Sequence, residues 1–132
     1  MPSILIIEDH MLFANAIQRL LARQTDLEIV EIVQSGEEAL KKLPELKVDL
    51  ALVDVSLPSM NGIDLVQHIR TEFPHLRCLM LSGHMTANYV KRALDVGASG
   101  YVLKDDVNGI LEGIRRALDG EVYVSQALRR YE

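Results

Sequence analysis

Short apolar runs alternate with helix-like stretches about five times along this chain of 132 residues. The runs "SILIIED", "LALVDV" and "LRCLML" are apolar almost throughout, which is typical of strands that are buried on both faces of a sheet. The stretch "LEIVEIV" alternates polar and apolar residues, and "GYVL" is a shorter apolar run, so both also favour strands. A chain of this length and pattern predicts one α/β domain whose parallel sheet is covered on both faces.

Five helices are expected between and after these strands. The first covers 11–23, the second opens at Ser35, the third ends before Pro74, the fourth lies between Thr86 and Gly97, and the last covers 107–118. The spacing of Ser35 and Glu38 is typical of a capping box, in which the side chain of each residue accepts a hydrogen bond from the backbone N–H of the other. In sheets of this kind, functional groups lie at the carboxyl ends of the strands.

Charge and cysteine content limit the classes of function. The formal net charge of -5 disfavours a nucleic-acid-binding surface on this part of the protein. The lone cysteine, Cys78, lies in an apolar run and is expected to be a buried structural residue rather than a catalytic thiol. The start of the chain does not resemble a signal peptide, and no run approaches the length of a membrane span, so we expect a cytoplasmic protein without membrane contact.

Candidate functional residues lie at the ends of four of the predicted strands. They are Glu8 and Asp9 after the first, Asp54 after the third, Ser82 with His84 after the fourth, and Lys104 after the fifth. Clustered carboxylates repel one another unless a cation neutralises them, and a set of hard oxygen ligands favours magnesium or calcium. With a lysine and a hydroxyl nearby, this edge is suited to phosphoryl transfer. A carboxylate in such a site can act as the nucleophile and form an acyl phosphate.

In order and spacing, these segments resemble the receiver domain of two-component response regulators. "IIEDH" resembles the acidic pair, "LVDVSLPSMNG" the phosphoacceptor segment, "LSGH" the Ser/Thr motif, and "GASGYVLKD" the segment with the switch aromatic and the lysine. The resemblance implies a flavodoxin-like (βα)5 fold with a doubly wound, five-stranded parallel sheet in the order 2-1-3-4-5. It places the receiver in residues 1–120. It implies self-catalysed phosphotransfer and dephosphorylation at Asp54 rather than an enzyme.

The resemblance also carries roles over to individual positions. Asp54 matches the phosphoacceptor, and Mg²⁺ would be held by Glu8, Asp9, Asp54 and the backbone carbonyl of Ser56. The roles of phosphate binding and switching fall on Ser82, Lys104 and Tyr101, while Ser56 and His84 occupy positions that tune the lifetime of the phosphoryl group. The family more often has Asp at the position of Glu8, which is expected to change magnesium affinity only modestly.

The end of the chain resembles receivers of the NarL/FixJ (LuxR-type) subfamily. This implies a histidine kinase as phosphodonor, a homodimer on phosphorylation, and control of transcription through a C-terminal helix-turn-helix domain that is missing here. Residues 121–132 are then expected to begin the linker to that domain. The alternative is a complete, stand-alone receiver.

Other interpretations of the same residues remain open at this stage. Each site residue taken alone also fits a structural role, as a turn, cap or solvated residue. A phosphatase of the haloacid dehalogenase type also forms an aspartyl phosphate, but it normally has a second aspartate where this chain has Ser56. A pseudo-receiver that works without phosphate is the other alternative, although such modules typically lose residues of the acidic pair or the lysine.

Overall fold

The computed structural model describes residues 1–83 and 87–132. The strands are β1 (Ser3–Ile7), β2 (Glu28–Val33), β3 (Leu50–Asp54), β4 (Arg77–Ser82), β5 (Gly100–Leu103) and β6 (Tyr123–Val124). The α-helices are α1 (Met11–Ala22), α2 (Gly36–Lys42), α3 (Gly62–Glu72), α4 (Ala87–Asp95) and α5 (Val107–Leu118). Two 3₁₀ helices complete the described elements, η1 (Leu43–Glu45) and η2 (Gln126–Tyr131).

All strands of the sheet are parallel, in the order β2-β1-β3-β4-β5-β6. This confirms the predicted order 2-1-3-4-5 and adds a sixth strand beyond β5. The register pairs Asp54 with Leu81 and Ser82 with Leu103, so the carboxyl ends of β3, β4 and β5 lie next to one another. The functional side chains that follow these strands are therefore brought to one edge.

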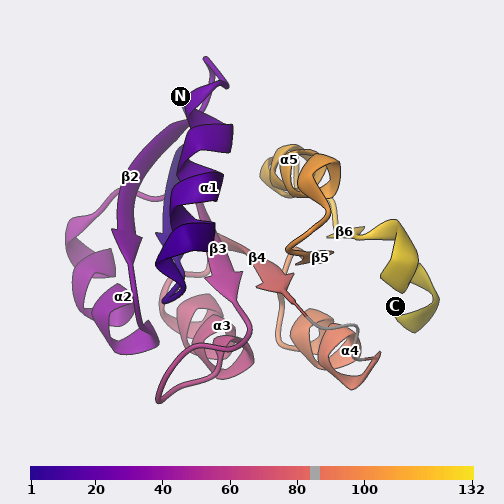
Figure 1. Ribbon diagram of the computed structural model, residues 1–132. Coiled ribbons are helices and arrows are strands. Elements are labelled where there is room, and N and C mark those ends of the chain that lie inside the picture. Colours follow the sequence, from indigo (N-terminus) through magenta and orange to yellow (C-terminus); the bar gives the residue numbers. More distant parts are fainter. Residues whose placement is uncertain (84–86) are drawn as a thin grey trace.

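Each face of the sheet has its own apolar core, because successive side chains of a strand point to opposite faces. In β1, Ile4 and Ile6 pack into the cluster under α1 and α5, while Leu5 and Ile7 pack into the cluster under α2, α3 and α4. Figure 1 shows α1 and α5 on one side of the sheet, with α2, α3 and α4 on the other. The continuous apolar runs in the sequence reflect this double burial.

Helix boundaries follow the capping residues of the sequence. The Ser35 hydroxyl accepts a hydrogen bond from the Glu38 backbone N–H at 3.1 Å, which is half of the predicted capping box. Gly97 follows α4 with a φ of 100°, a left-handed conformation that suits glycine. The predicted cap at Thr86 and the predicted tuning residue His84 lie outside the described residues. None of the described helices has both the length and the apolar character required to cross a bilayer.

Residues 121–132 pack against the domain. β6 extends the sheet by pairing Tyr123 with Gly100 and Val124 with Tyr101. The following helix, η2, contacts α4, and its Leu128 side chain is fully buried. In Figure 1 this segment, in yellow, lies at the edge of the sheet beside α4. We call residues 121–132 the C-terminal segment.

Candidate functional site

Three carboxylates meet at the carboxyl edge of the sheet. Glu8 and Asp9 follow β1 directly, and Asp54 is the last residue of β3. Each offers a carboxylate oxygen, and these three oxygens lie within 4.8 Å of one another. Glu8 and Asp54 are buried, with 1% and 3% of their surface exposed, whereas Asp9 is exposed to solvent. The structure thus brings together the acidic group that the sequence predicted.

Lys104 reaches this group from the end of β5. Its Nζ lies 2.8 Å from Oε1 of Glu8 and 3.4 Å from Oδ1 of Asp54. The backbone N–H of Lys104 donates to the carbonyl of Ser82 at 2.8 Å, which fixes the start of the loop between β5 and α5 against the end of β4. One ammonium group therefore pairs with two buried acids.

The electrostatic balance of the site favours a further cation. The pKa of Glu8 is raised to about 7, chiefly by burial. The Lys104 ammonium acts to lower this pKa, and the neighbouring Asp54 carboxylate acts to raise it. The backbone N–H of His10 also donates to Oε2 of Glu8 at 3.0 Å. Three carboxylates against one lysine leave the site short of positive charge. The hard oxygen donors fit Mg²⁺, which prefers such ligands.

The loop after β3 folds back over Asp54. The Ser56 backbone N–H donates to Oδ1 of Asp54 at 3.1 Å, which orients the carboxylate. Gly62, the first residue of α3, donates its N–H to the carbonyl of Val55 at 2.8 Å. A Cβ atom at Gly62 would lie 2.2 Å from the carbonyl oxygen of Asp54, so the close approach requires glycine. The "MNG" segment at the start of α3 therefore has a direct role in shaping the site.

Ser82 and Tyr101 lie on neighbouring strands beside the carboxylates. Ser82 ends β4 and is buried, and the Tyr101 side chain is fully buried within β5. Burial raises the pKa of Tyr101, while the nearby Ser82 hydroxyl acts in the opposite direction. Among the described residues, none forms a hydrogen bond of acceptable geometry with the Tyr101 hydroxyl. Tyr101 is thus in an inward position next to the predicted switch serine.

Sequence reasoning assigned no site role to Phe13. In the structure, Nζ of Lys104 lies 4.7 Å from the centroid of the Phe13 ring, a distance typical of a cation–π interaction. Phe13 lies in the first turn of α1, which begins two residues after Asp9, and this closeness in the sequence is the signal that could have placed the ring near the site.

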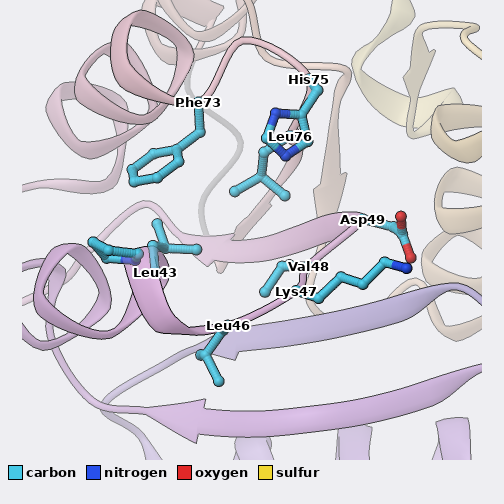
Figure 2. A pocket seen from close by; sticks show the side chains of 9 residues that line it. Leu43, Leu46, Lys47, Val48, Asp49, Phe73, His75 and Leu76 are labelled. Atoms are coloured by element: carbon cyan, nitrogen blue, oxygen red, sulfur yellow. The ribbon is translucent and has the colours of Figure 1, made fainter.

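A groove lies at the amino ends of the strands, away from the carboxylates. The groove has a volume of about 380 Å³ and is formed by residues that precede β3 and β4. Figure 2 shows the side chains that line it. It is lined by Leu43, Pro44, Leu46, Lys47, Val48, Asp49, Phe73, His75 and Leu76. None of the predicted site residues lies there, so the chemistry is concentrated at the carboxyl edge.

Residues 4–115 match the family described as the response regulator receiver domain. The chain belongs to this family. The order, spacing and geometry of the motifs agree with this membership. A receiver domain is a signalling module rather than an enzyme that turns over separate substrates.

The relatives of this receiver domain are response regulators. It is 33% identical over 122 residues to the transcriptional regulatory protein DegU of Brevibacillus brevis, covering 92% of this chain and 52% of the relative. It is 33% identical over 119 residues to the response regulator protein VraR of Staphylococcus saprophyticus, covering 89% of this chain and 57% of the relative. The receiver domain thus spans little more than half the length of these relatives.

Two solved structures with a similar fold belong to LuxR-type or NarL response regulators. A LuxR-family two-component response regulator from Aurantimonas sp. superposes with a TM-score of 0.93 and 27% identity, covering 98% of this chain and 93% of the other. The receiver domain of the putative response regulator NarL from Mycobacterium tuberculosis superposes with a TM-score of 0.85 and 27% identity, covering 91% and 98%. The predicted NarL/FixJ (LuxR-type) resemblance is confirmed.

Proposed function

We propose that Asp54 accepts a phosphoryl group from a histidine kinase and that phosphorylation switches the output surface of this domain. The observation that carries the proposal is the meeting of Asp54, two further carboxylates and Lys104 at one edge. Turn residues serving separate structural roles have no reason to converge in this way. Ser82 ends β4, the strand next to β3, and Tyr101 lies in β5, the strand beyond it.

In the proposed site, Glu8, Asp9, Asp54 and the backbone carbonyl of Ser56 hold Mg²⁺. When bound, the ion offsets the negative charge of the carboxylates and of the incoming phosphoryl group. The buried position of Glu8 and Asp54 keeps their oxygens in fixed positions, and exposed Asp9 leaves the site open to solvent and to a donor. The Ser56 N–H fixes Oδ1 of Asp54.

The chemical step is a displacement at phosphorus. A carboxylate oxygen of Asp54 attacks the phosphorus atom of the kinase phosphohistidine, the P–N bond breaks, and the imidazole leaves. The product is an acyl phosphate on Asp54. Lys104, which already reaches Oδ1 of Asp54, pairs with the phosphoryl oxygens, and the Ser82 hydroxyl bonds to them.

Phosphorylation brings up to about two negative charges and three acceptor oxygens to this edge. Lys104 and Ser82 move toward the new group, and the α4–β5–α5 surface and Tyr101 repack. This is a population shift between two arrangements, biased by phosphorylation. We infer that the output is transcription control by a dimer, through a DNA-binding domain in the longer protein, because DegU is named as a transcriptional regulator.

The test is phosphorylation by acetyl phosphate with and without Mg²⁺, read by intact mass. Wild type should gain one phosphoryl group only with Mg²⁺, and Asp54→Asn should gain none because the nucleophile is lost. Asp119→Asn, at an exposed position next to the end of α5, is the matched control and should behave as wild type. A phosphoryl group on Asp54→Asn would show that the phosphoacceptor is wrong. No gain by folded wild type would favour a pseudo-receiver that acts without phosphate.

A further inference from the structure

Ser125 connects the C-terminal segment to the loop that carries Lys104. Only 1% of its surface is exposed. Its hydroxyl oxygen accepts from the backbone N–H of Leu103 at 3.0 Å and donates to Oδ2 of Asp106 at 2.8 Å. Its own backbone N–H donates to the carbonyl of Tyr101 at 3.0 Å. One buried serine therefore contacts three positions around Lys104.

These bonds fix the loop between β5 and α5 from one side. Asp106 uses its other oxygen, Oδ1, to cap α5 through the Gly109 N–H at 3.0 Å. On the opposite side of the loop, the Lys104 N–H donates to the Ser82 carbonyl. The backbone at Leu103 and Lys104 is thus held between Ser82, at the site, and Ser125, in the C-terminal segment. A displacement at one of these contacts acts on the other.

The C-terminal segment is itself closely fitted to the domain. A Cβ atom on residue 100 would lie only 2.1 Å from the carbonyl oxygen of Tyr123. The close approach of the two backbones therefore requires Gly100. The buried Leu128 side chain belongs to the same apolar cluster as Tyr101 and Val90. The segment therefore packs on the core around the predicted switch aromatic, in addition to its bonds with the Lys104 loop.

We propose that Ser125 is a positioning residue for Lys104, and that it couples the C-terminal segment to phosphoryl transfer at Asp54. The proposal rests on the proposed function. Loss of the hydroxyl leaves the Leu103 N–H and one oxygen of Asp106 without this partner, and it removes two of the contacts that fix the loop presenting the ammonium. Coupling between two sites is reciprocal. Phosphorylation that holds Lys104 at Asp54 therefore strengthens the docking of the C-terminal segment.

The first test compares phosphorylation rates of Ser125→Ala and Arg129→Ala. Arg129 also stabilises the C-terminal segment, through a 3.1 Å hydrogen bond from Nε to the Val124 carbonyl, but within the described part of the chain it makes no hydrogen bond or ion pair with the Lys104 loop. The rate with acetyl phosphate should fall about tenfold in Ser125→Ala, a loss that modest misplacement of a catalytic group can cause. Arg129→Ala should stay within about twofold of wild type, as expected of a purely structural change.

A double-mutant cycle separates positioning from general destabilisation. When Lys104→Ala has removed the ammonium, adding Ser125→Ala should lower the remaining rate by less than about twofold, because nothing is left to position. Equal losses in the two backgrounds would overturn the proposal. Thermal unfolding of each variant confirms that the compared proteins are folded.

Amide hydrogen exchange tests the reverse direction of the coupling. Exchange in residues 121–131 should be slower in phosphorylated than in unphosphorylated wild type, and this response should be absent from Ser125→Ala. Unchanged exchange in phosphorylated wild type, or a wild-type rate in Ser125→Ala, would overturn the coupling and leave the proposed function intact. Failure of wild type to accept any phosphoryl group would instead overturn the proposed function, and the coupling with it.

Discussion

Glu8 and Asp54 are acids that are almost fully buried, and they share the ammonium group of Lys104. Burying a carboxylate is unfavourable unless it is paired or bound to a cation. The rise in the pKa of Glu8 is the sign of this incomplete compensation. At the scale of single residues, the site is therefore built for an added cation rather than for its own stability.

Gly62 gives a residue-scale prediction. In Gly62→Ala, the new Cβ would meet the Asp54 carbonyl oxygen at 2.2 Å, and that oxygen belongs to backbone that cannot move freely. We expect a loss of about 1–3 kcal/mol in the free energy of unfolding, the range typical of overpacking. Urea unfolding measures this loss, and phosphorylation by acetyl phosphate should also slow because Asp54 is displaced.

Gly83→Ala is the control for Gly62→Ala. A Cβ atom at Gly83 meets nothing within 4 Å among the described residues, so the free energy of unfolding should change by less than about 0.5 kcal/mol. Equal stability of the two variants would show that the close approach at Gly62 is relieved without cost.

At the scale of elements, the end of α5 is tied to the start of β4. Nη1 of Arg77 donates to the carbonyls of Ala117 and Leu118 at 2.7 and 2.9 Å. These carbonyls lie in the last turn of α5, where a cation is favourable. The end of α5 distant from the site is thus fixed, while its first turn adjoins the loop of Lys104.

We expect Arg77→Ala to lower the free energy of unfolding by about 1–3 kcal/mol, since two hydrogen bonds from a charged donor are lost. Amide exchange should become faster in the last turn of α5. The control is Arg116→Ala, which removes an exposed pair with Glu112 and should cost about 0.5 kcal/mol or less. If the two variants lose equal stability, the contacts of Arg77 do not hold the helix end.

At the scale of the whole molecule, Mg²⁺ binding should stabilise the fold, because the unfolded chain cannot assemble the three carboxylates. At ten times the dissociation constant, a ligand specific for the folded state adds about 1.4 kcal/mol. For a domain of this size this corresponds to a rise of about 5 °C in the unfolding temperature. Excess EDTA should reverse the rise, and thermal unfolding monitored by circular dichroism measures it.

Asp9→Asn provides the control for the magnesium effect. The side chain of Asp9 is exposed, so its replacement should leave the fold intact while removing one ligand. The rise in unfolding temperature should be largely lost in this variant. An equal rise in both proteins would place Mg²⁺ elsewhere.

Much of this molecule could be predicted from sequence because its key residues follow strands. Once the apolar runs are recognised as parallel strands, Asp54 and Lys104 must come to one edge, although 50 positions separate them. The C-terminal segment was not predicted as part of the sheet. Its apolar residues are too few to show a periodicity, and its docking depends on Gly100. The role of Ser125 depends on Asp106, 19 positions away, and no local pattern indicates such a pair.

The position of β6 at the edge of the sheet also bears on aggregation. An open strand edge presents unpaired N–H and C=O groups, which can recruit a strand from another molecule. β6 covers the edge of β5 and is itself only two residues long, so it offers little template. The other outer strand of the sheet, β2, carries the charged residues Glu28 and Glu31. The C-terminal segment therefore also protects the folded chain from edge-to-edge strand pairing with another molecule.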